Sequence, residues 1–184
     1  MPVICKRTPA SLLGILTLCL LLSGAACVKR STQETESHPE EQLYFDAKLG
    51  FTLLHPLSWE RLRVPVSSPE FRENSVNWKI PTVGGSGRMQ VLAYPALANS
   101  ADLPTLLEQF LAGSPEFSRE EPEELQLAGG EALAITVRRP TYSQRLFAIH
   151  GARRAYLLSF QGSTDNFAEQ LPRFNRIAES FHEN

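Results

Sequence analysis

The residue of this chain with the clearest chemistry is Cys27, which follows four small residues, Ser23-Gly24-Ala25-Ala26. A cysteine thiol is a nucleophile that can receive a diacylglyceryl group, and small residues ahead of it let the extended chain enter a peptidase cleft. We therefore predict that the Cys27 thiol is lipidated and that the chain is cut directly before it. The cysteine would then be both the mature N-terminus and the membrane anchor.

The segment ahead of the cysteine has the order of a secretory signal. Lys6 and Arg7 precede an apolar run over residues 10–22, as in a signal peptide. Spanning a bilayer takes roughly 20 apolar residues, so a permanent transmembrane helix is the weaker interpretation. The motif resembles a bacterial lipobox, although Gly24 stands where a lipobox prefers leucine. The alternative is ordinary cleavage after Ala26, which would leave an unpaired thiol on an exported chain.

The arginines are the second group of residues that could bind a ligand. From residue 43 onward there are twelve arginines and two lysines. Five arginines lie on or between the last three predicted strands: Arg138, Arg139, Arg145, Arg153 and Arg154. Guanidinium groups suit phosphate and carboxylate ligands, so these five form a candidate anion or partner patch. The alternative is that they are solvated charges at turns, since adjacent residues on a strand point to opposite faces.

Other polar motifs lack the partners that catalysis or metal binding needs. Ser86 lies among glycines, but a strand follows it rather than the helix of a nucleophile elbow or phosphate loop. His55 and His150 end predicted strands without a close-spaced ligand, so a metal between them is the minor alternative. The acidic run over residues 116–124 lacks calcium-loop spacing. We predict a flexible turn, polar strand ends and a solvated loop, with no cofactor and no enzymatic activity.

Composition narrows the class of protein. The chain has 184 residues and a net charge of −2, which argues against nucleic-acid binding. Removing residues 1–26 takes away two bases and no acid, so the mature chain has 16 bases, 20 acids and a charge of −4. Residues 27–42 hold the lipidated cysteine and a flexible tether. Residues 43–184 remain for a single folded domain.

Strands and two helices must position the polar groups of this domain. Apolar alternation predicts eight strands, over residues 43–46, 51–56, 60–64, 75–80, 88–94, 131–139, 142–150 and 153–161. The first two form a hairpin, and the last three are antiparallel because their links are too short for a parallel crossover. Trp59 and Trp78 are expected in the core.

The helices are predicted from apolar residues that recur at helical spacing. Asp102 is the expected N-cap of a helix that ends at Gly113, with apolar residues at helical spacing. A second helix begins at one of residues 163–165 and is expected to be kinked or split by Pro172. His182 lies at an expected frayed terminus. Together these elements predict an α+β domain with a central antiparallel sheet.

The order of short sequence motifs along the domain resembles that of the PsbP-like and Mog-like domains. Tyr44-Phe45, Gly50-Phe51 and residues 55–59 (HPLSW) are similar to their opening pattern, and residues 174–181 (FNRIAESF) are similar to their closing pattern. The bacterial DcrB-like lipoproteins are the nearest group in architecture. The resemblance implies an α/β/α sandwich, with a central antiparallel sheet flanked by helices, and a non-enzymatic accessory or binding role.

Two functions fit the anchor, the tether and this fold. We favour a monomeric, lipid-anchored envelope protein that docks another envelope or membrane protein. In a Gram-negative organism it would lie on the periplasmic face of the outer membrane, because Val28 rather than an aspartate follows the cysteine. The alternative is a periplasmic carrier that holds a small anionic or apolar ligand between a helix and the sheet.

Overall fold

The computed structural model describes residues 40–63, 72–82, 85–94, 102–112 and 118–184. These residues belong to one compact unit, Glu36–Asn184. Cys27, the signal segment and most of the tether lie outside the described residues. Their predicted roles therefore stay predictions.

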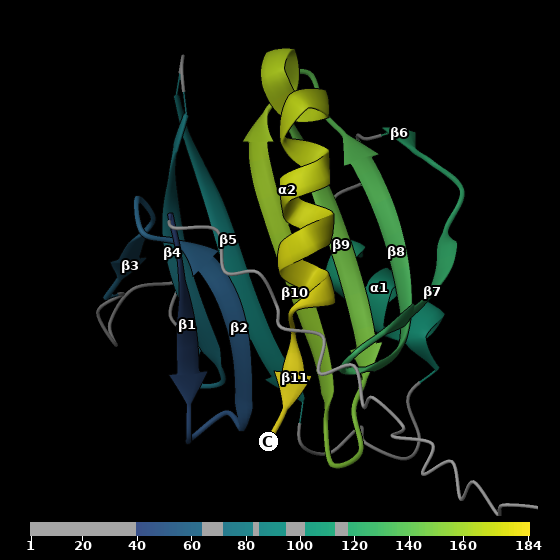
Figure 1. Ribbon diagram of the computed structural model, residues 1–184. Helices are drawn as coiled ribbons and strands as arrows, with labels where there is room; N and C mark the ends of the chain where they lie inside the picture. The colour runs from purple at the N-terminus through teal and green to yellow at the C-terminus, as the bar shows by residue number, and fades with distance from the viewer. Residues whose placement is uncertain (1–39, 64–71, 83–84, 95–101, 113–117) are drawn as a thin grey trace, which may run out of the picture. The chain divides into compact units, whose positions relative to one another are not determined.

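A large antiparallel sheet forms the centre of this unit (Figure 1). Its strands lie in the order β3-β4-β5-β10-β9-β8-β6, and β7 also pairs with β8. Their bounds are β3 (Glu60–Leu62), β4 (Ser75–Thr82), β5 (Gly85–Tyr94), β6 (Ser118–Arg119), β7 (Glu123–Leu127), β8 (Gly130–Arg138), β9 (Tyr142–His150) and β10 (Ala155–Ser163). The pairings β8–β9 and β9–β10 are antiparallel, as predicted from their short links.

Alternation along the strands gives the large sheet two apolar faces. On β10, Tyr156 and Leu158 belong to one buried cluster and Leu157 to the other, because successive side chains of a strand point to opposite sides. The first cluster also contains both predicted core tryptophans, Trp59 and Trp78. The second cluster packs against helix α1 (Leu103–Leu111). The sheet is thus covered on both faces.

The first face is shared between a helix and a second sheet. Helix α2 (Phe167–Glu179) lies over β9 and β10, and a three-stranded sheet lies beside it (Figure 1). That sheet consists of β1 (Glu41–Asp46), β2 (Phe51–Pro56) and β11 (His182–Glu183), in the order β1-β2-β11. The predicted hairpin is confirmed, since β1 and β2 are antiparallel and Gly50 takes a positive φ of 71° at the turn.

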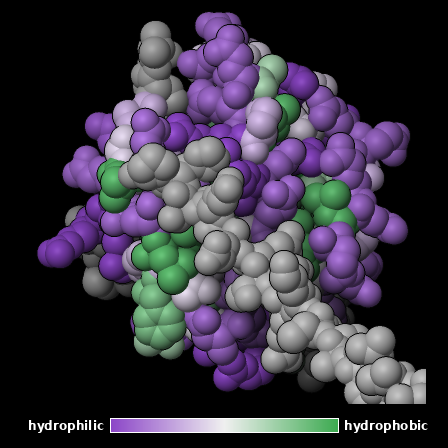
Figure 2. Space-filling model, in the orientation of Figure 1, coloured by the Kyte–Doolittle hydropathy of each residue, from purple (hydrophilic) through white to green (hydrophobic). Residues whose placement is uncertain are grey.

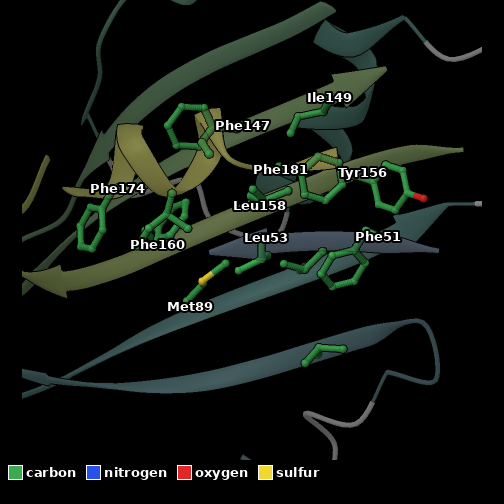
Figure 3. Packing of buried hydrophobic residues seen from close by; sticks show 14 of the residues in the cluster. Phe51, Leu53, Met89, Phe147, Ile149, Tyr156, Leu158, Phe160, Phe174 and Phe181 are labelled. Atoms are coloured by element: carbon green, nitrogen blue, oxygen red, sulfur yellow. The ribbon is translucent and has the colours of Figure 1, made fainter. Parts of the chain in front are cut away.

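Aromatic side chains fill the space between this layer and the large sheet (Figure 3). The rings of Phe160 and Phe174 stack with centroids 4.9 Å apart, and Phe147 meets Phe160 edge to face at 5.8 Å. Phe51 and Phe181 stack at 5.6 Å. Such pairs add about 0.5–1.5 kcal/mol each to the free energy from area burial. These aromatic pairs bring side chains of α2, β2 and the end of the chain into one hydrophobic core.

Helix α2 corrects two expectations. It is a single helix from Phe167 to Glu179 with Pro172 inside it, so the chain is not split there. Pro172 is exposed, whereas Phe174 and Ile177 are buried on the opposite side of the helix. Apolar packing of that side compensates for the one backbone hydrogen bond that proline cannot donate. A 3-10 turn, Thr164–Asn166, precedes the helix, and Asn166 rather than residues 163–165 is its N-cap.

Three further expectations are corrected. Residues His182–Glu183 are not frayed but pair with β2, and the amide of Asn184 donates to the carbonyl of Gly50. The acidic segment is not only a solvated loop, because β6 and β7 lie within or next to it and pair with β8. The glycine-rich turn is shorter than expected, since β5 begins at Gly85.

Candidate functional site

An apolar patch lies on the outer face of the small sheet. Leu43, Phe45 and Leu57 are 65%, 60% and 56% exposed, and they are the exposed large apolar residues found in the described part of the chain. Figure 2 shows hydrophobic side chains gathered over β1 and β2, in green at the lower left. We call Leu43 and Phe45, which share one face of β1, the β1 patch; Leu57 follows the end of β2 and is not part of it.

Strand alternation explains why these side chains face outward. Tyr44, between Leu43 and Phe45, points inward and meets Trp78 edge to face with centroids 5.0 Å apart. Because neighbours on a strand face opposite sides, anchoring Tyr44 in the core forces Leu43 and Phe45 outward. In the small sheet β1 is an edge strand. The patch therefore combines apolar side chains with a strand edge.

The strand that carries the patch is acidic. Glu40, Glu41 and Asp46 lie within residues 40–46, which contain no base. Glu41 is ion-paired with Arg176 of α2, and its side chain is only 3% exposed. Asp46 accepts hydrogen bonds from the hydroxyl of Tyr44 at 2.8 Å and from the amide of Leu49 at 2.9 Å. The Glu41–Arg176 ion pair joins β1 to α2, and the Asp46 contacts are local to β1 and the turn after it.

A polar cavity of about 610 Å³ lies between strand β5 and the second half of α1. We call it the β5 cavity. Its described lining consists of Arg72, Asn74, Arg88, Gln90, Leu92, Tyr94, Gln109 and Phe110. The lining therefore includes two guanidinium groups, three amides and a phenol next to apolar side chains. A neighbouring cavity of about 320 Å³ shares Arg72 and adds Arg61 and Arg63.

This arginine group was not predicted from the sequence. The alternation of β5, where Arg88, Gln90, Leu92 and Tyr94 share one face, was the available signal. Arg72 comes from the turn before β4, and the pairing of β4 with β5 brings it close. Near Arg72 that pairing joins Ser75 to Leu92, which are far apart in the chain.

Three of the five predicted arginines lie towards one end of the sheet. Arg138, the last residue of β8, binds Glu120, with its Nη2 2.5 Å from Oε1, and this contact holds the pKa of the Glu120 carboxyl below its usual range. Arg139 lies over the ring of Tyr142 at 5.1 Å. Arg145 is buried.

The other two lie at the opposite end of β9. The backbone N–H of Arg153 donates to the carboxylate of Glu183 at 2.9 Å. The guanidinium of Arg154 donates to the carbonyl of Lys48 at 3.1 Å. The structure therefore divides the five arginines between the two ends of a nine-residue strand. They do not gather into one patch.

The histidines are also placed separately. His55 is buried, with its ring 5.6 Å from that of Trp78 and its Nδ1 2.9 Å from the carbonyl oxygen of Pro56. Burial lowers the pKa of His55, and the contact with Pro56 partly opposes that shift. His150 instead lines a cavity of about 680 Å³ together with Asp102, Glu124 and Glu131. Within the described residues no group of three or more His, Cys, Asp or Glu is arranged to hold a metal ion.

The described helices do not extend to membrane-spanning length and apolarity. No protein-family model matches this sequence, and no curated protein matches it. Similarity appears only in the three-dimensional structure.

Three solved structures are similar in fold. Cyanobacterial PsbP (CyanoP) from Synechocystis sp. PCC 6803 has a TM-score of 0.60 at 16% identity, covering 82% of this chain and 96% of its own. The Ran-binding protein Mog1p of Saccharomyces cerevisiae has a TM-score of 0.53 at 10% identity, covering 78% and 95%. LpqN of Mycobacterium tuberculosis, titled as involved in cell envelope biogenesis, has a TM-score of 0.50 at 13% identity, covering 77% and 89%. The chain has the PsbP/Mog-like fold.

Proposed function

We propose that this chain is a non-enzymatic accessory module that docks another protein of the cell envelope and is tethered there by a lipid on Cys27. The observation that carries the proposal is the exposed β1 patch of Leu43 and Phe45. An exposed edge strand has backbone N–H and C=O groups that can pair with another chain, and exposed apolar side chains favour burial by a partner. A natural partner that covers it would explain why it is retained on the surface.

The similar structures support a binding role in general terms. Mog1p is named as Ran-binding, and LpqN is titled as involved in envelope biogenesis. At 10–16% identity the likeness extends to the fold, so neither partner is transferred to this chain. The similar structures favour a role for this chain as an accessory module built on an α/β/α sandwich of this type.

The charge around the β1 patch indicates what kind of partner fits. Residues 40–184 carry 14 Lys+Arg and 18 Asp+Glu, a net charge of −4, although Glu40 and Glu41 beside the patch are paired with Arg173 and Arg176. Anionic lipid headgroups would be repelled by the net negative charge of the domain. The occupant we propose is therefore a protein segment with apolar side chains and basic flanking residues, rather than the bilayer.

The anchor limits where that partner can be. Strand β1 begins 14 residues after Cys27, and a fully extended chain reaches about 3.3–3.6 Å per residue. The patch would therefore work within about 50 Å of the membrane. We propose a membrane protein or a membrane-proximal envelope protein as the partner, at the outer membrane if the organism is Gram-negative.

A photo-activated cross-linking residue at position 43 or 45 of the full-length chain tests this role in the native host. The control position is 169, because Glu169 is exposed on α2 rather than on β1. We expect one protein adduct of constant mass from positions 43 and 45 and none from position 169. The adduct is then identified by mass spectrometry, and the purified partner is titrated with wild type and with Leu43→Gln.

The titration decides between the outcomes. We expect at least tenfold weaker binding for Leu43→Gln and unchanged binding for Glu169→Gln, together with weaker binding at high salt. A lipid adduct alone, an adduct of two copies of this chain, or equal affinity of both variants would reject the proposal.

A further inference from the structure

The free edge of strand β1 is a second binding feature, next to the β1 patch. We propose that the partner adds one extended segment to this edge as a further strand of the small sheet, with alternate apolar side chains against Leu43 and Phe45. This inference rests on the proposed function, because it describes how the partner of the β1 patch is held. It goes further by assigning the conformation of the partner segment and the backbone groups that bind it.

The hydrogen-bond pattern of the hairpin decides where the backbone groups of β1 point. The amide of Leu57 donates to the carbonyl of Glu40 at 2.7 Å, one pair beyond the register of Glu41 with Pro56. In an antiparallel pair, alternate residues turn their N–H and C=O groups towards the partner strand. Counted from Glu40, the residues that turn these groups towards β2 are Gln42, Tyr44 and Asp46. The residues that turn them towards the free edge are Glu41, Leu43 and Phe45.

The other side of β2 gives the same assignment. The amide of Asn184 donates to the carbonyl of Gly50 at 2.9 Å, which continues the pairing of β11 with β2. Even-numbered residues of β2 therefore turn their backbone groups towards β11, and odd-numbered residues such as Leu53 turn theirs towards β1. Leu53 is opposite Tyr44 in the register. Tyr44 therefore faces β2, and its two neighbours face the edge.

Strand β1 lacks the features that usually protect a sheet edge. It is the outer strand of the small sheet, with β2 as its neighbour among the described strands (Figure 1). Its six residues contain no lysine, arginine or proline, and its register with β2 runs through all six pairs without a bulge. The other described edge strands, β3, β6, β7 and β11, are shorter. Because exposed edges are normally kept short or blocked by charge, proline or a bulge, this edge favours a partner that forms a strand.

The β1 patch lies beside the same edge. Leu43 and Phe45 have their side chains on the outer face of the sheet and their N–H and C=O groups at the edge. Side chains of paired strands contact each other across the ladder, so an added segment would place its own alternate side chains against these two residues. Main-chain hydrogen bonds then contribute affinity, and the apolar contacts contribute specificity. The segment that fits has apolar residues at alternate positions and no proline where it pairs.

A second copy of this chain fits the edge less well than another protein. Two copies of β1 that pair antiparallel through all three edge residues would be centred on Leu43, with Glu40 of each copy opposite Asp46 of the other. Like charges directly opposite each other destabilise a strand pair. Glu40 lies 4.0 Å from Arg173, but its side chain is 83% exposed. Basic residues at the ends of the added segment would instead face acids at both ends of the edge.

The test follows hydrogen exchange of single amides by NMR in the mature chain. In the free chain we expect slow exchange at Gln42 and Tyr44, which pair with β2, and fast exchange at Leu43 and Phe45. The probe is a short synthetic peptide of alternating valine and threonine between terminal lysines. At millimolar concentration it should slow the exchange of Leu43 and Phe45 at least tenfold. The same peptide with every valine and threonine N-methylated cannot donate backbone hydrogen bonds and should leave the exchange fast.

Two variants at one position separate the backbone from the side chain. Leu43→Ala and Leu43→Pro both lose the leucine side chain, but only the proline also loses the N–H that points to the edge. We expect Leu43→Pro to weaken peptide binding at least tenfold more than Leu43→Ala. Proline is tolerated where a strand N–H faces an open edge, and urea unfolding shows whether the variant is folded. Leu57→Ala, at an exposed apolar residue outside β1, should leave binding unchanged.

Four results would overturn the inference. The first is slow exchange of Leu43 and Phe45 in the free chain, as a pair of copies joined at β1 would produce. The second is fast exchange of both amides in the presence of the peptide, and the third is equal protection by the methylated peptide. The fourth is an equal loss of binding in folded Leu43→Pro and Leu43→Ala. The exchange measurements use the wild-type chain, so they decide the question even if the proline variant does not fold.

The docking role is judged separately, with the partner captured at position 43 or 45. If that partner binds Leu43→Gln more weakly but leaves the exchange of Leu43 and Phe45 fast, the docking role stands and the added strand is rejected. If the peptide protects both amides and no partner is captured, the strand edge is a binding site and the docking role is rejected.

Discussion

The hydroxyl of Tyr156, on β10, lies 3.2 Å from the carboxylate of Glu183, the second-last residue of the chain. The same hydroxyl lies 3.1 Å from the carbonyl oxygens of Leu49 and Gly50. Burial raises the pKa of Tyr156 strongly, and the negative charge of Glu183 adds to the shift. The phenol therefore keeps its proton and joins the β1–β2 turn to the chain end.

Replacing this hydroxyl should destabilise the domain. Tyr156→Phe removes the donor to the buried carbonyl of Leu49, whereas the carbonyl of Gly50 keeps the amide of Asn184, and the free energy of unfolding should fall by about 1–2 kcal/mol. Urea unfolding followed by circular dichroism measures the difference. Tyr142→Phe is the control, because the structure gives the Tyr142 hydroxyl no hydrogen bond to a described residue. Equal stability of Tyr156→Phe and wild type would contradict the role assigned to this contact.

The buried guanidinium of Arg145 depends on an exposed acid. Its Nη2 lies 2.5 Å from Oε2 of Glu123, and its Nη1 donates to Thr136 at 3.1 Å. The side chain of Arg145 is 6% exposed and that of Glu123 is 57% exposed, and the Nε of Arg145 has no hydrogen-bond partner among the described residues. Loss of the acid leaves a buried charge, whereas loss of the base leaves a solvated one.

We therefore expect an asymmetry between the two single variants. Glu123→Gln should lower the free energy of unfolding by about 2 kcal/mol, and Arg145→Met should lower it by less than about 1 kcal/mol. Paired denaturant titrations measure both values. A larger loss for Arg145→Met would show that the ion pair itself, and not the burial of an uncompensated charge, dominates.

His55 should make stability depend on pH. Its folded-state pKa is lowered from 6.5, first by burial, so the unfolded chain binds a proton more readily than the folded one. The contribution of His55 is complete above pH 6.5 and is lost as the pH falls towards its folded-state value. Unfolding free energies at pH 7.5, 6.5 and 5.5 should fall in that order.

The variant His55→Gln separates this group from the carboxylates. It removes the titration, so its stability should change less than that of wild type between pH 7.5 and 5.5. His182→Gln, at an exposed position of β11, should keep the wild-type dependence. Parallel pH profiles for wild type and His55→Gln would show that other groups carry the effect.

The lipid anchor is tested at the thiol. Cys27→Ala removes the nucleophile that would accept the diacylglyceryl group, so the protein should move from the membrane fraction to the soluble fraction of the host envelope. The matched control is Cys19→Ala, which lies in the segment expected to be removed and should leave the distribution unchanged. Retention of Cys27→Ala in the membrane fraction would favour an uncleaved apolar segment.

Local sequence patterns were sufficient for most elements of the fold. The alternation over residues 43–46 and 51–56 gave the hairpin, and the short links after Arg138 and His150 gave the antiparallel order of β8, β9 and β10. These predictions succeeded because side-chain period and loop length act between near neighbours. The ends of the elements were less accurate, as with the first turn of α2, where a 3-10 turn comes first.

Contacts between distant residues could not be predicted in the same way. No local pattern indicates that His182 pairs with Thr52, or that Arg72 and Arg88 line one cavity. The five arginines chosen from sequence were neighbours in the chain, but β9 carries them to opposite ends of the sheet. Closeness in sequence does not predict closeness in space when a strand nine residues long separates two groups of residues.

The sequence by itself predicts the signal segment and the lipidated Cys27, and it determined the two-residue period of the strands and the helical spacing after Asp102. Each depends on residues within a few positions of one another. Only the tertiary structure decided that Leu43 and Phe45 face outward, that Arg72 meets the face of β5, and that Glu183 closes on Tyr156. Those outcomes depend on which strands pair and which face is buried, and that choice is made by the packing of the whole core.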